Sequence, residues 1–183
     1  MKTAHTLKMS LLAVALAVMP VAYAATMTKA DYKADKIRIT AEYKADKAAC
    51  GSLAGNANDI CVEQAKGKEK LALAQLEYAH TGKAEDQNKI MKTKAEVDYA
   101  VAKEKCDDLA GNAKDVCVQE AKAAETKALA DAKLDKKVGE AQTDAAVDKR
   151  DADYKVAAEK CDALAGDAKA GCMSAAKMKF GKN

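Results

Sequence analysis

The fold of this chain follows from Tyr99-Ala-Val-Ala-Lys-Glu-Lys-Cys106-Asp-Asp-Leu109-Ala-Gly111-Asn112, a segment that occurs in three versions. The other two run from Tyr43 to Asn56 and from Tyr154 to Asp167. Tyrosine, cysteine, leucine and glycine hold the same offsets in all three, and the copies begin 56 and then 55 residues apart. Self-similarity at a fixed period indicates a repeat architecture. The sequence therefore predicts a threefold internal repeat.

Each copy has the pattern of a helix that ends in a turn. Its tyrosine, cysteine and leucine lie at offsets 0, 7 and 10, so they share one helix face with the residue at offset 3. That fourth residue is alanine in the second and third copies but Asp46 in the first. Glycine favours the end of a helix, and the Asn or Asp after it is a good N-cap for the next helix. We therefore predict hairpin turns at Gly55-Asn56, Gly111-Asn112 and Gly166-Asp167.

The composition predicts an all-α fold. No proline follows Pro20, and the chain is rich in Ala, Lys, Asp and Glu, a mixture that favours helix. We expect three helical hairpins, arranged as a bundle or as an elongated array. Their approximate arms are 27–54 and 56–80, 84–110 and 112–138, and 140–165 and 167–180. These hairpins divide the chain into repeats at 25–82, 83–138 and 139–183, the last of them truncated.

The two joints between hairpins stay open at this point. Thr81-Gly82 and the neighbourhood of Gly139 are candidate turns. Either joint could instead be helical, because an isolated glycine in a helix costs only about 1 kcal/mol relative to alanine. A helical joint would merge two neighbouring arms into one long rod.

The six cysteines form three pairs whose members are eleven residues apart. In an unbroken helix such a pair would be about 16 Å apart, well beyond the roughly 7 Å between Cα atoms that a disulfide allows. In a hairpin bent midway between them, the two cysteines face each other. The spacing therefore predicts disulfides Cys50–Cys61, Cys106–Cys117 and Cys161–Cys172, each stabilising its hairpin by about 2–3 kcal/mol.

These cross-links have a clear structural purpose. Leu, Ile, Val and Phe make up about 13% of residues 25–183, below the roughly 20% of chains that build an ordinary core. Hairpins with such thin, alanine-lined contacts need covalent support, because burial of alanine contributes little. A redox role has little support, since no Cys-x-x-Cys occurs to depress the pKa of a thiol.

The first 24 residues have the pattern of a cleaved signal peptide. Lys2 and Lys8 are basic, residues 11–18 form a short apolar run, and Ala22-Tyr23-Ala24 is a small-x-small cleavage signal. The apolar run is shorter than the roughly 20 residues that span a membrane. We therefore expect a periplasmic protein that is cleaved after Ala24, with no transmembrane segment in the mature chain and with its cysteines oxidised.

The sequence offers few of the residues that catalysis or metal binding require. His80 is the single histidine after residue 24 and is expected on the surface at a helix end, and no two cysteines have the spacing of a zinc knuckle. Without the two lysines of the leader, the net charge of +3 falls to +1, with the two signs interspersed. We therefore expect no enzymatic activity, no cofactor, no metal and no nucleic-acid partner.

Three resemblances follow from these patterns. The Ala/Lys/Asp/Glu-rich, proline-free body resembles the helical spacer of TolA-like envelope proteins of Gram-negative bacteria. Tyr32-Lys-Ala-Asp-Lys36 and Tyr43-Lys-Ala-Asp-Lys47, eleven residues apart, are similar to the repeats of late-embryogenesis-abundant stress proteins. The paired-cysteine hairpins are similar in construction to twin-Cys helical hairpins, which have two cysteines in each helix instead of one.

The leading hypothesis is a non-enzymatic exported repeat protein that acts as an envelope scaffold, spacer or stress-protective protein. Its partners would be envelope proteins or further copies of itself. The alternative is a periplasmic binding or chaperone-like module that holds a peptide, a lipid or an unfolded client. A thiol-redox or metal-binding protein is the third hypothesis.

Overall fold

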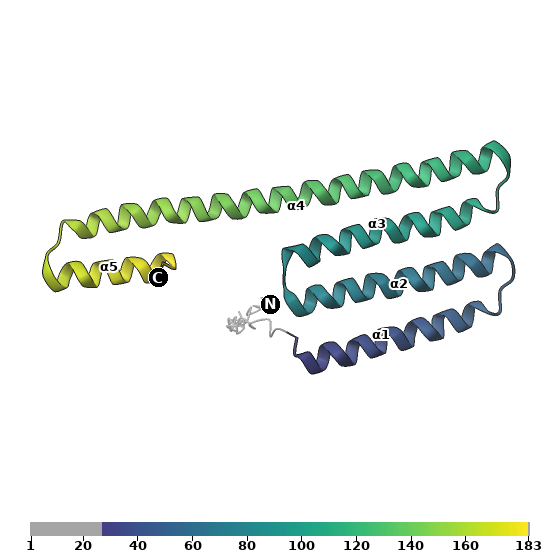
Figure 1. The fold of residues 1–183 in the computed structure, drawn as a ribbon, viewed down its shortest axis with the longest axis horizontal. Coiled ribbons are helices and arrows are strands. Elements are labelled where there is room, and N and C mark those ends of the chain that lie inside the picture. The colour runs from purple at the N-terminus through teal and green to yellow at the C-terminus, as the bar shows by residue number, and fades with distance from the viewer. Residues whose placement is uncertain (1–26, 183) are drawn as a thin grey trace, which may run out of the picture.

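The structure is a computed structural model that describes residues 27–182, and this part of the chain forms helices only. The expected signal peptide, residues 1–24, lies outside the described residues. Five helices follow one another along the chain (Figure 1). They are α1 (Lys29–Cys50), α2 (Asn56–Thr81), α3 (Ala84–Cys106), α4 (Gly111–Asp162) and α5 (Gly166–Phe180).

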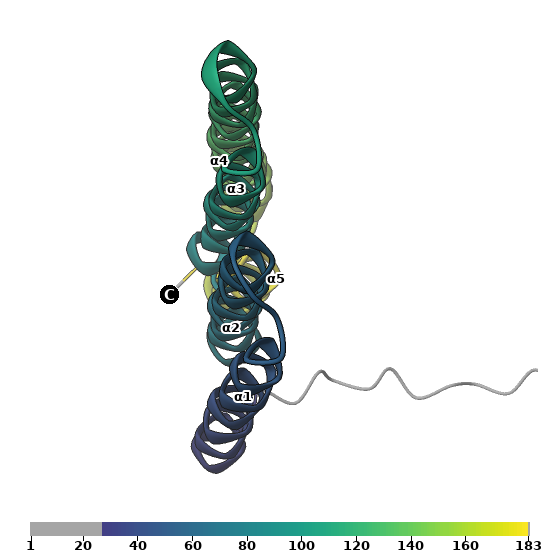
Figure 2. The same ribbon diagram turned by 90° about the vertical axis from the view of Figure 1, so that its right-hand side faces the viewer.

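The helices form one layer. α1, α2, α3 and the first part of α4 lie side by side, each antiparallel to its neighbour, and α5 folds back against the far end of α4 (Figure 1). Seen from the end, the first four helices form a single column, one helix thick (Figure 2). Within the described residues, each helix contacts only its neighbours in the chain. The protein is thus an elongated array of hairpins in which no central core forms among residues 27–182.

The prediction of three disulfide-linked hairpins is confirmed, but the six expected arms form five helices. The arms at 112–138 and 140–165 are one continuous helix, α4, which has 52 residues. At 1.5 Å per residue, α4 is about 78 Å long. The boundary expected between residues 138 and 139 therefore lies inside a helix.

The first joint is a turn because glycine and two side chains support it. Gly82 has a left-handed φ of 64°, and its N–H donates to the carbonyl of Tyr78 at 2.8 Å. The Thr81 hydroxyl accepts from the backbone N–H of Lys83 at 3.2 Å and donates to the Asp86 carboxylate at 2.5 Å. A left-handed glycine just past the last turn is a common helix stop.

The second joint is helical because the matching position holds valine. Counted from the repeat tyrosine, Val138 stands where the first copy has Gly82. A β-branched residue is a strong outlier at positive φ, so this position cannot make the same stop. Gly139 follows one residue later and stays helical, and the Thr143 hydroxyl donates to its carbonyl at 2.9 Å.

The buried positions recur every eleven residues. Ile39 and Cys50 show this spacing in α1, Ala95 and Cys106 in α3, and in α4 the buried alanines at 121 and 132. Eleven residues complete three turns at 3.67 residues per turn, close to the 3.6 of a straight helix. The buried stripe therefore stays nearly parallel to each helix axis, which suits helices laid side by side.

Small residues allow the helices to approach closely. Half of the buried side chains are alanines, and the others are Ile39, Leu76, Asn88 and the first cysteine of each disulfide. Gly67 is the tightest point, because a Cβ atom at this position would overlap the side chain of Val97 on α3. The interface between α2 and α3 therefore depends on glycine at position 67.

Two glycines inside helices are expected to respond in opposite directions to the same substitution. Gly67→Ala should lower the free energy of unfolding by about 1–3 kcal/mol, because the added methyl group overpacks the α2–α3 interface. Gly139→Ala should raise it by up to about 1 kcal/mol, because its Cβ would meet open space. Denaturation followed by circular dichroism measures both changes. Shifts of the same sign would contradict this packing.

Candidate functional site

The hairpin tips are the most regular feature of the molecule. The Cα atoms of the paired cysteines are 5.6, 5.7 and 5.6 Å apart, and the first cysteine of each pair is completely buried. All six predicted pairing partners are confirmed. Each turn passes through a glycine with a φ between 54° and 57°, a conformation that favours glycine. These residues are Gly55, Gly111 and Gly166.

The asparagine or aspartate after each glycine lies in the first turn of the next helix, and its side chain does not cap that helix. The predicted capping role of Asn56, Asn112 and Asp167 is therefore wrong. The reason is that each following helix begins one or two residues earlier than predicted, at the turn glycine or at the residue after it. Asn56 has another use, since its amide donates to the carbonyl of Glu104 at 2.8 Å and ties the first tip to α3.

The tips expose one leucine each. Leu53, Leu109 and Leu164 are about 44–45% exposed. The tips that carry Leu53 and Leu109 lie at one end of the array, and the tip of Leu164 lies at the opposite end (Figure 1). The same local surface is thus presented at both ends of the long helix.

An ion pair bridges the tip in two of the three copies. Lys114 contacts Asp107 at 2.8 Å, and Lys169 contacts Asp162 at 2.9 Å. In the first copy Gly51 replaces the aspartate, and the Asn58 amide donates to the carbonyl of Cys50 instead. The hydrogen bond from Lys114 lowers the pKa of Asp107.

This ion pair predicts a pH-dependent contribution to stability. Since the pKa of Asp107 is lower in the folded chain than its ordinary 3.8, the pair stabilises the fold above this pH and is lost as the pH falls below it. Asp107→Asn should therefore lower the melting temperature at pH 7 by a small amount, and by less at pH 2.5, because the contribution is lost as the pH falls through the lowered pKa. Asp108→Asn, next to the pair, is the control. An equal effect of Asp107→Asn at both pH values would disprove the coupling.

A second cluster ties the start of α1 to the end of α2. The Tyr32 hydroxyl donates to the Glu77 carboxylate at 2.7 Å, and this bond raises the pKa of Tyr32. The His80 ring lies 4.7 Å from the Tyr32 ring, and its Nδ1 is 3.1 Å from the carbonyl of Met27. His80 is therefore packed and hydrogen-bonded instead of being a solvated surface residue as expected, because the lead-in to α1 reaches it.

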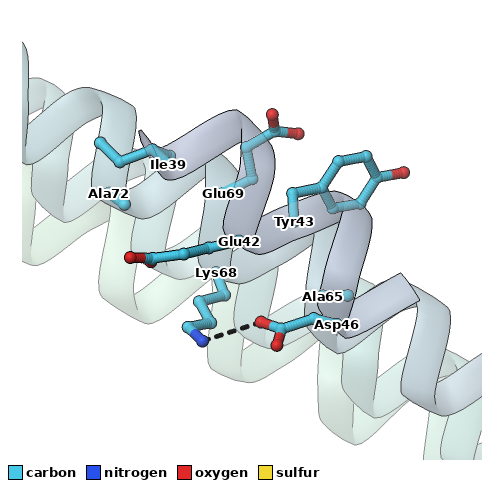
Figure 3. A pocket seen from close by; sticks show the side chains of 8 residues that line it. All are labelled: Ile39, Glu42, Tyr43, Asp46, Ala65, Lys68, Glu69 and Ala72. Carbon is cyan, nitrogen blue, oxygen red and sulfur yellow. Dashed lines mark hydrogen bonds and ion pairs between the residues drawn. The ribbon is translucent and has the colours of Figure 1, made fainter. Parts of the chain in front are cut away.

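Two hollows occur beside the helices. One, of about 20 Å³ between α1 and α2, is flanked by Ile39, Tyr43 and the ion pair Lys68–Asp46 at 2.8 Å (Figure 3). It has room for about one water molecule. The other is an open hollow of about 1160 Å³ where α3 begins beside α4, with Asn88 and Gly139 in its walls.

The larger hollow offers few groups for binding a ligand. Asn88 is buried, and its amide donates to the carbonyl of Ala132 at 2.5 Å, which joins α3 to α4. Within residues 27–182, no three His, Cys, Asp or Glu side chains are grouped so that they could share a metal ion. No helix among the same residues is both long and apolar enough to cross a membrane.

No protein-family model, no curated protein and no solved structure matches the chain. Its function is therefore inferred from the geometry of its own residues.

Proposed function

We propose that this protein is a non-enzymatic spacer of the cell envelope that holds two groups of hairpins apart on one long helix. The observation that carries the proposal is the middle of α4, where residues 133–150 are all exposed. This stretch of 18 residues is about 27 Å long. α3 packs along the N-terminal part of α4 and α5 along its C-terminal end, so the helix alone connects them (Figure 1).

The exposed stretch has the composition of a bridging helix. Eleven of its 18 residues are polar or charged, and a largely polar helix is typical of segments that span solvent between packed regions. Local interactions support it, among them the ion pair of Lys136 with Glu140 at 3.6 Å, one turn apart. These features favour a rod whose length, more than any single side chain, matters to function.

The disulfides support an exported location. Cross-links of this kind persist in oxidising compartments and are rare in the cytosol. Together with the expected signal peptide at 1–24, they favour the periplasm as the place of action. There the two ends of α4, each with an exposed tip leucine, would contact different envelope proteins or further copies of this chain.

Photo-crosslinking in cells tests the spacer. A photoreactive residue is placed at Lys36 of α1, at Met178 of α5 and at Gly139 in the middle of α4, all of them exposed positions. A spacer predicts discrete cross-linked species from both ends, with different partners at each. Discrete species at neither end, or identical patterns from all three positions, would contradict it.

A binding module is the second candidate, and the large hollow beside Gly139 favours it. If a peptide or an unfolded client binds there, cross-links will concentrate at Gly139 and spread over many products. The same experiment therefore separates the two functions.

A further inference from the structure

α4 carries an apolar stripe on the side that no other helix covers. α3 and α5 both lie on the same side of α4, which leaves its opposite side as the outer edge of the array (Figures 1 and 2). Nine exposed apolar residues follow this edge, and we call them the outer stripe. They are Val116, Ala123, Ala130, Leu134, Val138, Ala141, Ala145, Ala152 and Val156.

The stripe is opposite to the packed face of the helix. Its members are three, four or seven residues apart, so they line one face, and this face is roughly half a turn away from the buried Ala121, Ala132 and Cys161. Its larger members, Leu134 and Val138, are 59% and 46% exposed. An aliphatic row of this length on a solvent face is a candidate contact surface.

We propose that a second copy of this chain covers the outer stripe, with the two α4 helices antiparallel about a two-fold axis beside residues 139 and 140. In this register large residues meet small ones. Leu134 lies opposite Ala145 of the second copy, Val138 opposite Ala141, and Val156 opposite Ala123. Pairing of this kind lets two helices interdigitate closely.

The charges of α4 favour this antiparallel register. Residues 122–137 carry five positive and three negative side chains, whereas residues 140–153 carry two positive and five negative ones. An antiparallel pair places the basic segment of one copy against the acidic segment of the other, while a parallel pair would place like charges together.

Both flanks of the stripe agree with the same register. On one flank, Lys133 and Lys137 meet the acidic row Glu140, Asp144 and Asp148 of the second copy. On the other flank Asp131 faces Lys149 of the second copy, again with opposite charge. Lys127 lies on the stripe itself, between Ala123 and Ala130, and comes near Asp153 of the second copy. Complementary flanking charges set partner choice and orientation in paired helices.

The size of the contact indicates a reversible dimer. Residues 123–156 cover about 50 Å of helix, and a helix is about 10 Å wide, so the pair would bury roughly 1000 Å² in total. This area is near the lower limit for specific interfaces. An isologous contact closes on itself, so assembly through this edge stops at two copies. The pair also continues the antiparallel order of the layer.

Analytical ultracentrifugation of the oxidised chain tests the stripe. The wild-type protein should change from monomer to dimer with rising concentration, at or below about 1 mM. Leu134→Glu/Val138→Glu should shift the equilibrium toward monomer at least tenfold, with an unchanged circular dichroism spectrum. Val147→Glu is the matched control, since Val147 is 38% exposed on the same stretch but lies off the stripe, and it should dimerise like wild type.

Charge reversal tests the register. Lys133→Glu/Lys137→Glu and Asp144→Lys/Asp148→Lys should each weaken self-association at least tenfold when studied alone. Mixed in equal amounts, the two variants should form a heterodimer, because each flank again joins opposite charges. A monomeric wild type, or a dimer that survives Leu134→Glu/Val138→Glu, would overturn the proposal, and so would a mixture that fails to associate.

Discussion

Replacing Cys161 and Cys172 together with alanine is expected to unfold α5 while the other helices remain. α5 has 15 residues, and Ala176 is its one buried residue. Its further anchors to α4 are the Tyr154–Phe180 ring contact at 6.3 Å and the partly buried ion pair of Lys182 with Asp151. Isolated helices of this length are marginal in water, and the disulfide contributes about 2–3 kcal/mol.

The matched control is the same change in the second hairpin. Cys106→Ala/Cys117→Ala opens a loop of equal length, but α3 lies between α2 and α4 and contacts both. This variant should lose about 2–3 kcal/mol of stability and keep α3 folded. Hydrogen exchange read by mass spectrometry reports each helix separately. Full protection of α5 without its disulfide would show that packing alone holds the third hairpin.

Gly139→Pro is expected to break the long helix. Proline removes the backbone donor at position 139 and its ring collides with the carbonyl four residues earlier, at a cost of about 3 kcal/mol relative to alanine. Since residues 133–150 are all exposed, little packing compensates for the break. The two ends of α4 should then sample many relative orientations.

Gly139→Ala is the control for this break, because it changes the same residue and keeps the helix. The measurement is the hydrogen exchange of residues 133–150. Proline should raise the exchange rate of this stretch by at least tenfold, and alanine should lower it or leave it unchanged. Equal exchange in the two variants would mean that the stretch is not a continuous helix in solution.

The repeat predicted the hairpins and their cross-links well, because both depend on local spacing. Cysteines eleven residues apart with Gly-Asn or Gly-Asp between them leave one simple geometry, and the structure has it three times. The all-α class followed in the same way from the absence of proline after Pro20. These features need no knowledge of distant contacts.

The parts that the sequence left open depend on single positions or on tertiary context. The two joints differ by Gly82 in one and Val138 in the other, a difference that is visible only once the copies are aligned from their tyrosines. The capping role expected of Asn56 fails because α2 begins at this residue, with Gly55 before it as the N-cap. The Asn56 side chain instead donates to the carbonyl of Glu104 on α3. The choice between bundle and layer depends on which faces stay unpaired, which helix periodicity does not decide.

The most direct test of the extended α4 is a distance between two spin labels on this helix. Non-cysteine labels at Ala124 and Lys160, both exposed, leave the disulfides intact, and dilution with unlabelled protein restricts the signal to pairs within one chain. The labels are 36 residues apart, which corresponds to about 54 Å along a continuous helix. One narrow distribution near this value is predicted. A distribution centred below about 30 Å, as expected when the chain folds back at Gly139, would contradict the account.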